Sequence, residues 1–303
     1  MEISEQTFDS REGWVQLFCP SKLNLGLKIV GRTPQNYHLL ESLFWPINFG
    51  DTLWVKESRN WKLSIEWATN AAKSSQLPQE KENLLYRMWE FLGVSPPKIE
   101  VNLIKRTPIG GGLGGGSSNV ATLAKWWSKQ SPTPLDLSSL TELGADIPFF
   151  LNSPISPCWV TGIGENLKPL KISEEVKELF FLLIIPPVAC QTGKVFARYA
   201  QTTKDFSKSS EPPVIGWPQL TQWFQEMQND LSEPATSEAP QLKQILETLA
   251  KIPCLARGLS GSGSTCFLVF KNRREGHVAA KALEPFFRIT NCKSVSAHTY
   301  LET

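Results

Sequence analysis

Apolar residues occupy every second position from Leu23 to Ile29, which is the pattern of a β-strand with one buried face. Polar residues and glycine fill the positions between them, so Lys22 and Asn24 lie next to each other on the opposite face. Taken alone, this segment favours a polar face exposed to solvent. A strand that presents Lys22 and Asn24 to a ligand would have the same pattern.

Similar patterns along the chain predict the other elements. Alternation predicts strands over Trp61–Trp67 and Ile99–Leu103, and a continuous apolar run predicts a buried strand over Leu179–Ile185. Helical spacing predicts helices around residues 84–92, 120–127, 192–199, 220–227, 242–249 and 276–286, and further strands are expected at 254–259, 266–270 and 295–297. Antiparallel-looking strands with helices between them indicate an α+β fold in two lobes, which we place at residues 1–160 and 161–303.

The most unusual segment is Pro108–Asn119, because six of the seven residues from Gly110 to Gly116 are glycine. Ordering a glycine costs roughly 0.5–1 kcal/mol more than ordering an alanine, so six glycines indicate backbone that must approach something closely. A predicted strand precedes the loop, and a predicted helix follows it, with Ser117-Ser118 as the expected N-cap. Strand, glycine loop and helix N-terminus together form an anion-binding arrangement. The sequence therefore predicts a phosphate-binding loop, with a merely flexible loop as the alternative.

Two familiar phosphate-binding motifs fit this loop poorly. Walker A requires a lysine directly before the Ser/Thr, whereas Gly116 precedes Ser117. The dinucleotide pattern Gly-x-Gly-x-x-Gly is present, but a glycine-rich segment satisfies it easily. Its acidic partner, expected about 20 residues later, would have to be Asp136, which lies in a proline-rich stretch.

Two later segments have both a structural and a functional interpretation. Asp146 stands before an Ile-Pro step, where it is a good helix N-cap and also a candidate reactive carboxylate. The small-residue loop Ser260–Ser264 lies between two predicted strands and suits a tight hairpin as well as a site. The residues themselves leave both alternatives open.

Taken together, these segments resemble the GHMP family of small-metabolite kinases, named after galactokinase, homoserine kinase, mevalonate kinase and phosphomevalonate kinase. The resemblance runs from about Pro20 to Phe270, with Asn36 in place of a usual glycine. It is carried by Ser21-Lys22-Leu23-Asn24-Leu25, Tyr37-His38, Pro108–Asn119, Gly144–Phe149, Gly162–Glu165 and Leu259–Gly263. The resemblance implies a two-lobed GHMP kinase fold, with an N-terminal lobe like domain 2 of ribosomal protein S5 and a ferredoxin-like C-terminal lobe.

The resemblance also implies ATP-dependent phosphorylation of a small alcohol. Its motifs point to a cytidine diphosphate derivative of the non-mevalonate isoprenoid route, with mevalonate or homoserine as alternatives. Asp146 would accept the proton of the substrate hydroxyl, and Lys22 would keep Asp146 ionised. The implied ATP contacts are Asn83, Lys105, Pro108, Gly110, Gly111, Gly112, Leu113, Gly114, Gly115, Gly116, Ser117 and Ser118. The implied substrate contacts are Asn24, Tyr37, His38, Phe44, Thr192 and Phe196. Mg²⁺ is expected with ATP, and the sequence does not identify its ligands.

The composition argues against several other kinds of protein. A net charge of +2 with scattered Lys and Arg gives no basic stripe for nucleic acid. No apolar run reaches the roughly 18 residues of a membrane span, and residues 1–11 lack the apolar core of a signal peptide. The six cysteines form no Cys-x-x-Cys pair, as is usual for reduced cytosolic thiols. We expect a cytoplasmic monomer or weak homodimer that binds neither nucleic acid nor membrane.

Two functions of other classes fit the sequence less well than a kinase. A nucleotide-binding regulator would keep the glycine loop and lose catalysis, but both Lys22 and Asp146 are present. A Rossmann oxidoreductase would have its glycine loop after the first strand, whereas here the loop follows several antiparallel-looking strands.

Overall fold

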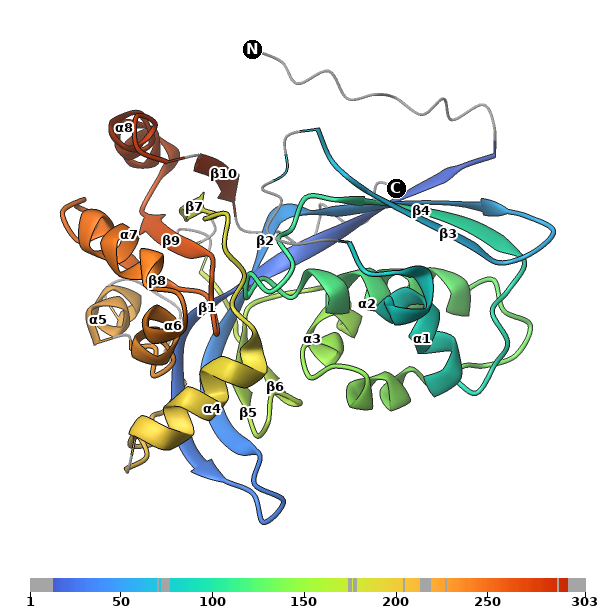
Figure 1. Ribbon diagram of the computed structural model, residues 1–303, viewed down its shortest axis with the longest axis horizontal. Helices are drawn as coiled ribbons and strands as arrows, with labels where there is room; N and C mark the ends of the chain where they lie inside the picture. The colour runs from blue at the N-terminus through green and yellow to red at the C-terminus, as the bar shows by residue number, and fades with distance from the viewer. Residues whose placement is uncertain are drawn as a thin grey trace.

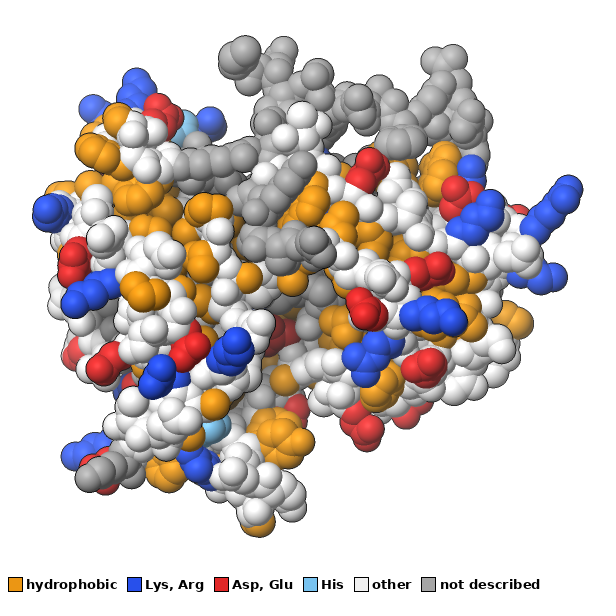
Figure 2. Space-filling view, in the orientation of Figure 1, with side chains coloured by type: hydrophobic (Ala, Val, Ile, Leu, Met, Phe, Trp, Pro, Cys, Tyr) orange, Lys and Arg blue, Asp and Glu red, His pale blue; other side chains and the backbone are white. Residues whose placement is uncertain are grey.

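The computed structural model describes residues 13–69, 71, 77–173, 176, 179–203, 205–212, 219–226, 228–287 and 289–293. It confirms the α+β class: two β-sheets lie side by side, each with its own helices (Figure 1). No helix within these ranges is long and apolar enough to span a membrane. Side chains of both charge signs are interspersed on the face shown in Figure 2.

The first sheet has the strand order β3-β4-β2-β5-β6, with β1 paired to β2. The long strands β1 and β2 are antiparallel, while β3 and β4 are parallel, unlike the antiparallel arrangement expected. Its strands are β1 (Val15–Arg32), β2 (His38–Glu57), β3 (Lys62–Trp67), β4 (Ile99–Lys105), β5 (Cys158–Thr161) and β6 (Asn166–Pro169). The helices beside it in Figure 1 are α1 (Leu84–Phe91), α2 (Gly115–Ser128) and α3 (Ile147–Leu151), and the 3₁₀ helices are η2 (Glu80–Glu82) and η3 (Leu137–Glu142).

The second sheet is antiparallel, in the order β10-β7-β9-β8. Its strands are β7 (Phe180–Ile184), β8 (Ala256–Leu259), β9 (Cys266–Phe270) and β10 (Ile289–Lys293). Its helices are α4 (Thr192–Thr202), α5 (Gln219–Glu226), α6 (Ser232–Glu238), α7 (Gln241–Leu249) and α8 (Arg273–Leu283). The strand predicted at 295–297 lies outside the described residues. The boundary at residue 160 stays a prediction, and β6 of the first sheet follows it in the chain.

The middle of β1, from Cys19 to Leu27, lies between the two halves of the molecule, and both its faces are buried there. Leu23 and Leu25 belong to a core cluster that also contains Phe181 and Phe267 of the second sheet. On the other face, Lys22 is 4% exposed and Asn24 is 2% exposed. The prediction that this polar face is exposed to solvent is therefore wrong, because loops from distant parts of the chain cover the face.

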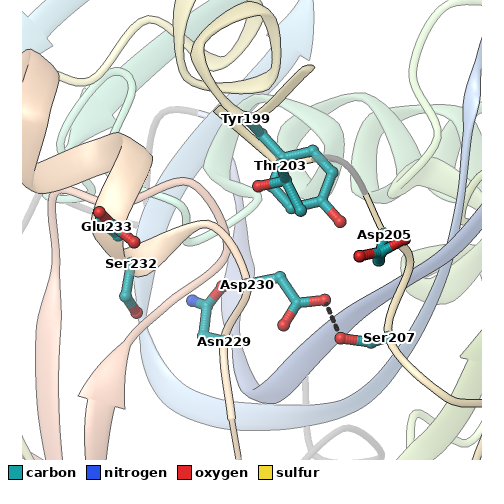
Figure 3. A pocket seen from close by; sticks show the side chains of 8 residues that line it. All are labelled: Tyr199, Thr203, Asp205, Ser207, Asn229, Asp230, Ser232 and Glu233. Carbon is teal, nitrogen blue, oxygen red and sulfur yellow. Dashed lines mark hydrogen bonds between the residues drawn. The ribbon is translucent and has the colours of Figure 1, made fainter. Parts of the chain in front are cut away.

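The polar segment Thr202–Pro213 is attached to the β1–β2 hairpin over its described part. The backbone N–H of Ser207 donates to the Ile29 carbonyl at 2.9 Å, and the Ser207 hydroxyl donates to Asp230 at 2.7 Å (Figure 3). The buried Glu41 carboxylate of β2 accepts hydrogen bonds from the Ser209 hydroxyl and from the Ser210 backbone. These contacts anchor the hairpin whose tip carries Tyr37 and His38.

Candidate active site

Lys22 and Asn24 of β1 form the buried centre of the candidate site. The Lys22 ammonium donates a hydrogen bond to Asn24 Oδ1, and its Nζ lies 3.5 Å from Asp146 Oδ2. The same nitrogen sits 4.5 Å from the centroid of the Phe44 ring. Burial lowers the pKa of Lys22, and the nearby Asp146 carboxylate opposes that shift. The site therefore holds a partly desolvated cation beside a carboxylate.

Asp146 stands at the N-terminus of α3, but its side chain does not cap the helix. Its backbone is in the right-handed helical region (φ −81°, ψ −12°), and its carboxylate makes no capping hydrogen bond. The side chain is 28% exposed, whereas that of its partner Lys22 is 5% exposed. Asp146 thus occupies the expected N-cap position, but its carboxylate is directed to Lys22 and does not cap the helix.

The glycine loop joins β4 to α2 and requires left-handed backbone. Gly112 and Gly114 have φ of +73° and +69°, a region that residues with a Cβ rarely adopt. Gly114 is the N-cap of α2, and no side chain caps that helix among the described residues. The prediction that Ser117-Ser118 caps the helix is wrong, since both residues lie within its first turn. The uncapped N-terminus leaves backbone N–H groups and the positive end of the helix dipole for a ligand.

The glycine loop packs directly against the Asp146 side chain. A Cβ built on Gly114 would lie 3.3 Å from Asp146 Oδ2 and 2.9 Å from a ring carbon of Phe150. A side chain at position 114 would therefore occupy the space between the loop and the carboxylate. The loop and the Lys22–Asp146 pair form one continuous site.

The Ser260–Ser264 loop connects β8 to β9 as a hairpin and also binds the glycine loop, so both interpretations of it hold. The Ser260 hydroxyl donates to the Gly112 carbonyl at 2.8 Å, and it accepts the backbone N–H of Asn24 at 3.1 Å. The N–H groups of Ser264 and Thr265 donate to the carbonyls of Gly110 and Gly111, each at 3.2 Å. Three of the GHMP-like segments, those around Asn24, Gly112 and Ser260, therefore meet at one place.

Asn83 and Lys105, two of the implied ATP contacts, lie near the part of the glycine loop that begins α2. Asn83 caps α1 by accepting the Leu85 N–H at 2.9 Å, and the adjacent Leu84 lies 3.1 Å from a Cβ built on Gly116. Lys105 is buried, with its ammonium paired to Asp51 and donating to the Thr107 hydroxyl at 2.8 Å. Pro108 packs against the loop at Gly111. A contact of Asn83 or Lys105 with ATP stays a prediction.

The structure brings only some of the implied substrate contacts close to one another. The His38 ring lies 5.2 Å from that of Phe196, and its buried Nε2 has no hydrogen-bond partner among the described residues. Tyr37 is 62% exposed, so its implied contact with the substrate stays a prediction. Phe44 is a core residue beneath the Lys22 ammonium. Thr192 is the first residue of α4 after the N-cap Gln191, and its hydroxyl is 3.0 Å from the Ser262 hydroxyl.

Comparison with known proteins gives the family. The model "GHMP kinases N terminal domain" matches residues 83–152, and "GHMP kinases C terminal" matches residues 218–288. A curated relative from Ruegeria pomeroyi, named 4-diphosphocytidyl-2-C-methyl-D-erythritol kinase, is 31% identical over 91% of this chain and 95% of its own length. This chain belongs to the GHMP kinase family. It is an ATP-dependent small-molecule kinase by that membership.

Solved structures agree with the GHMP assignment. A crystal structure of 4-(cytidine 5'-diphospho)-2C-methyl-D-erythritol kinase has a TM-score of 0.72 at 28% identity, covering 93% of this chain and all of that one. Homoserine kinase from Cytophaga hutchinsonii has a TM-score of 0.59 at 15% identity, covering 97% of this chain and 98% of that one. The second likeness shows the fold alone, which confirms the two-lobed GHMP architecture.

In this GHMP kinase, two further residues lie near the site. Tyr199 of α4 lies 5.6 Å from the His38 ring, and it borders a pocket of about 320 Å³ (Figure 3). Ser42 of β2 accepts a hydrogen bond from the Asn24 amide at 2.9 Å. Helical spacing marks Tyr199 as a core position, and Ser42 lies in a strand with no motif around it. The sequence gives neither residue a functional signal.

Proposed function

We propose that this GHMP kinase transfers the γ-phosphoryl group of ATP to the 2-hydroxyl of 4-diphosphocytidyl-2-C-methyl-D-erythritol, in the non-mevalonate route to isoprenoid precursors. The relatives that match nearly the whole chain carry the name of that kinase, which supports the choice of substrate. The main structural support for phosphoryl transfer is the Lys22–Asp146 pair, with 3.5 Å between Nζ and Oδ2, directly beside the glycine loop. Both substrates are charged small molecules, so we also infer a cytoplasmic enzyme.

The proposed mechanism assigns one role to each member of the pair. Asp146 accepts the proton of the substrate hydroxyl as the oxygen attacks the γ-phosphorus. The ammonium of Lys22 pairs with the Asp146 carboxylate, and it stabilises the charge that spreads over the transferred phosphoryl oxygens. Asn24 holds that ammonium in place through its Oδ1. In phosphoryl transfer, positioning and charge stabilisation account for most of the catalysis, which suits this buried arrangement.

ATP and Mg²⁺ fit the N-terminal end of α2. The loop has no lysine, so the phosphates would be held by backbone N–H groups and the helix dipole. Ser118 Oγ is buried without a hydrogen-bond partner among the described residues, and it fits a phosphate or a phosphate-bound metal. The described residues contain no cluster of three or more His, Cys, Asp or Glu that would hold a metal. Mg²⁺ commonly binds through substrate phosphates and few protein ligands, and here it would supply charge neutralisation.

The test is ATP consumption by the purified protein with each candidate alcohol. We expect turnover with 4-diphosphocytidyl-2-C-methyl-D-erythritol and none above background with mevalonate or homoserine. Turnover with mevalonate or homoserine instead would show that the proposed substrate is wrong, although the enzyme would still be a GHMP kinase. ATP binding without turnover on any of the three would favour a regulator that has lost catalysis.

We expect His38 to form a hydrogen bond with the polar edge of the cytosine base, because its buried Nε2 has no hydrogen-bond partner among the described residues. Burial and the charge of Arg32 lower the pKa of His38, so the neutral imidazole offers one donor and one acceptor. His38→Ala should narrow the preference for the cytidine substrate over its uridine analogue, because a site built for hydrogen bonds discriminates strongly. The ATP KM should stay unchanged.

Tyr37→Ala is the matched comparison for His38→Ala. We expect the Tyr37 ring to stack on the base of the substrate. Stacking of this kind accepts any base and contributes roughly 1–3 kcal/mol per base, so the variant should weaken binding of the cytidine and uridine substrates alike. The measurement is kcat/KM for both substrates with each variant. Full affinity and full cytidine preference in both variants would place the base elsewhere.

A further inference from the structure

The Asn24 side chain connects Lys22 to a residue outside the GHMP-like motifs. Its Oδ1 accepts a hydrogen bond from the Lys22 ammonium, and its Nδ2 donates to Ser42 Oγ at 2.9 Å. Ser42 lies on β2, 18 residues away in the chain, and is 1% exposed. Lys22, Asn24 and Ser42 thus form a buried chain of hydrogen bonds that crosses from β1 to β2.

The direction of these hydrogen bonds follows from what the Ser42 hydroxyl can donate. A serine hydroxyl has one proton, and Ser42 gives it to the Gly26 carbonyl, at 2.6 Å. Towards Asn24, Ser42 can therefore offer only a lone pair, so the NH₂ group of the amide must face Ser42. The amide oxygen is then fixed on the side of Lys22, where a reversed amide would place two donors against each other.

We propose that Ser42 is a positioning residue for phosphoryl transfer, which acts through Asn24 to hold the Lys22 ammonium beside Asp146. This inference rests on the proposed function, in which Lys22 stabilises the transferred phosphoryl group. Without the Ser42 hydroxyl, Nδ2 of Asn24 loses its acceptor and the amide is free to rotate. Lys22 then loses a fixed acceptor, and its ammonium shifts relative to Asp146 and the reacting oxygen.

The same contact bears on the charge of Lys22. Burial favours its neutral form, while the Asn24 oxygen and the Asp146 carboxylate favour the ammonium. Among the described residues, Asp146 at the start of α3 is the charged group that acts on Lys22, and β2 contributes only the uncharged Phe44 ring. Loss of the fixed acceptor should lower the pKa of Lys22 further. The alkaline limb of the kcat profile would then move to lower pH, because activity requires the ammonium.

The test compares Ser42→Ala with Ser42→Thr, which restores the hydroxyl. We expect the alanine variant to lower kcat about 10–100-fold with the ATP KM nearly unchanged, as for a catalytic group displaced by a fraction of an ångström to one ångström. Its alkaline limb should move to lower pH. The threonine variant should recover wild-type kcat and pH profile within about twofold. Ser128→Ala removes another serine-to-carbonyl hydrogen bond, at the far end of α2, and should change neither quantity.

A second measurement needs no turnover, so it separates this inference from the proposed function. The pKa of Lys22 can be followed by NMR of the folded protein with ¹³C-labelled lysine, with Lys22→Arg to assign the signal. We expect a lower pKa in Ser42→Ala than in wild type or Ser42→Thr. Equal Lys22 pKa values and equal pH profiles in the alanine and threonine variants would overturn the role of Ser42. Wild-type protein that fails to phosphorylate the proposed substrate would overturn only the proposed function.

Discussion

Asp146→Asn will lower kcat by about 10²–10⁴-fold while the protein stays folded. This is the usual contribution of a positioned general base, and the amide of asparagine can neither accept the hydroxyl proton nor carry the negative charge. Folding should be preserved because the Asp146 side chain caps no helix, and asparagine has nearly the same shape. The measurement is kcat at saturating ATP, together with a thermal melt and the Kd for ATP.

Asp136→Asn provides the matched control for Asp146→Asn. Asp136 is a true N-cap, since its Oδ1 accepts the Ser138 N–H at 3.0 Å at the start of η3. The substitution removes the same charge from an exposed helix start that has no contact with Lys22, so kcat should not change. Near-wild-type turnover in Asp146→Asn would return Asp146 to a structural role and remove the general base from the mechanism.

Gly112→Ala should disrupt the packing of the glycine loop against the Ser260–Ser264 loop and weaken ATP binding. A Cβ at this position would overlap the carbonyl oxygen of Ser260, so the glycine loop and the Ser260–Ser264 loop must move apart. Hydrogen bonds to charged groups contribute about 1.5–3 kcal/mol each, so every amide displaced from a phosphate should weaken ATP binding roughly 10–100-fold. Calorimetric titration with ATP measures this loss directly.

Gly93→Ala separates the effect of the clash from that of backbone strain. Gly93 has φ +66°, close to the φ of +73° at Gly112, but no atom lies within 4 Å of a Cβ built on it. Its alanine variant should lose only the roughly 1–2 kcal/mol of left-handed strain, with ATP binding intact. If both variants bind ATP equally well, the glycine loop is a hinge rather than a phosphate cradle.

Local features of the chain were predictable because they depend on neighbours in sequence. Strand β4 and helix α1 follow the predicted ranges closely, and Asn36 has the left-handed φ of +69° that asparagine tolerates in place of glycine. Alternation also placed Lys22 next to Asn24 on one face of β1. The glycine loop between a strand and a helix could be identified as an anion-binding device for the same reason.

The tertiary structure alone decided how these pieces are used, since the deciding contacts join residues far apart in the chain. Ser260 bonds to Asn24 across 236 positions and converts an apparently solvent-exposed strand face into a buried one. Asp146 faces Lys22 instead of capping α3, because the folded chain brings a buried ammonium within 3.5 Å of its carboxylate. Ser42 gains its place beside Asn24 only through the pairing of β2 with β1. No local pattern encodes these contacts, because each depends on the register and packing of elements that the sequence separates.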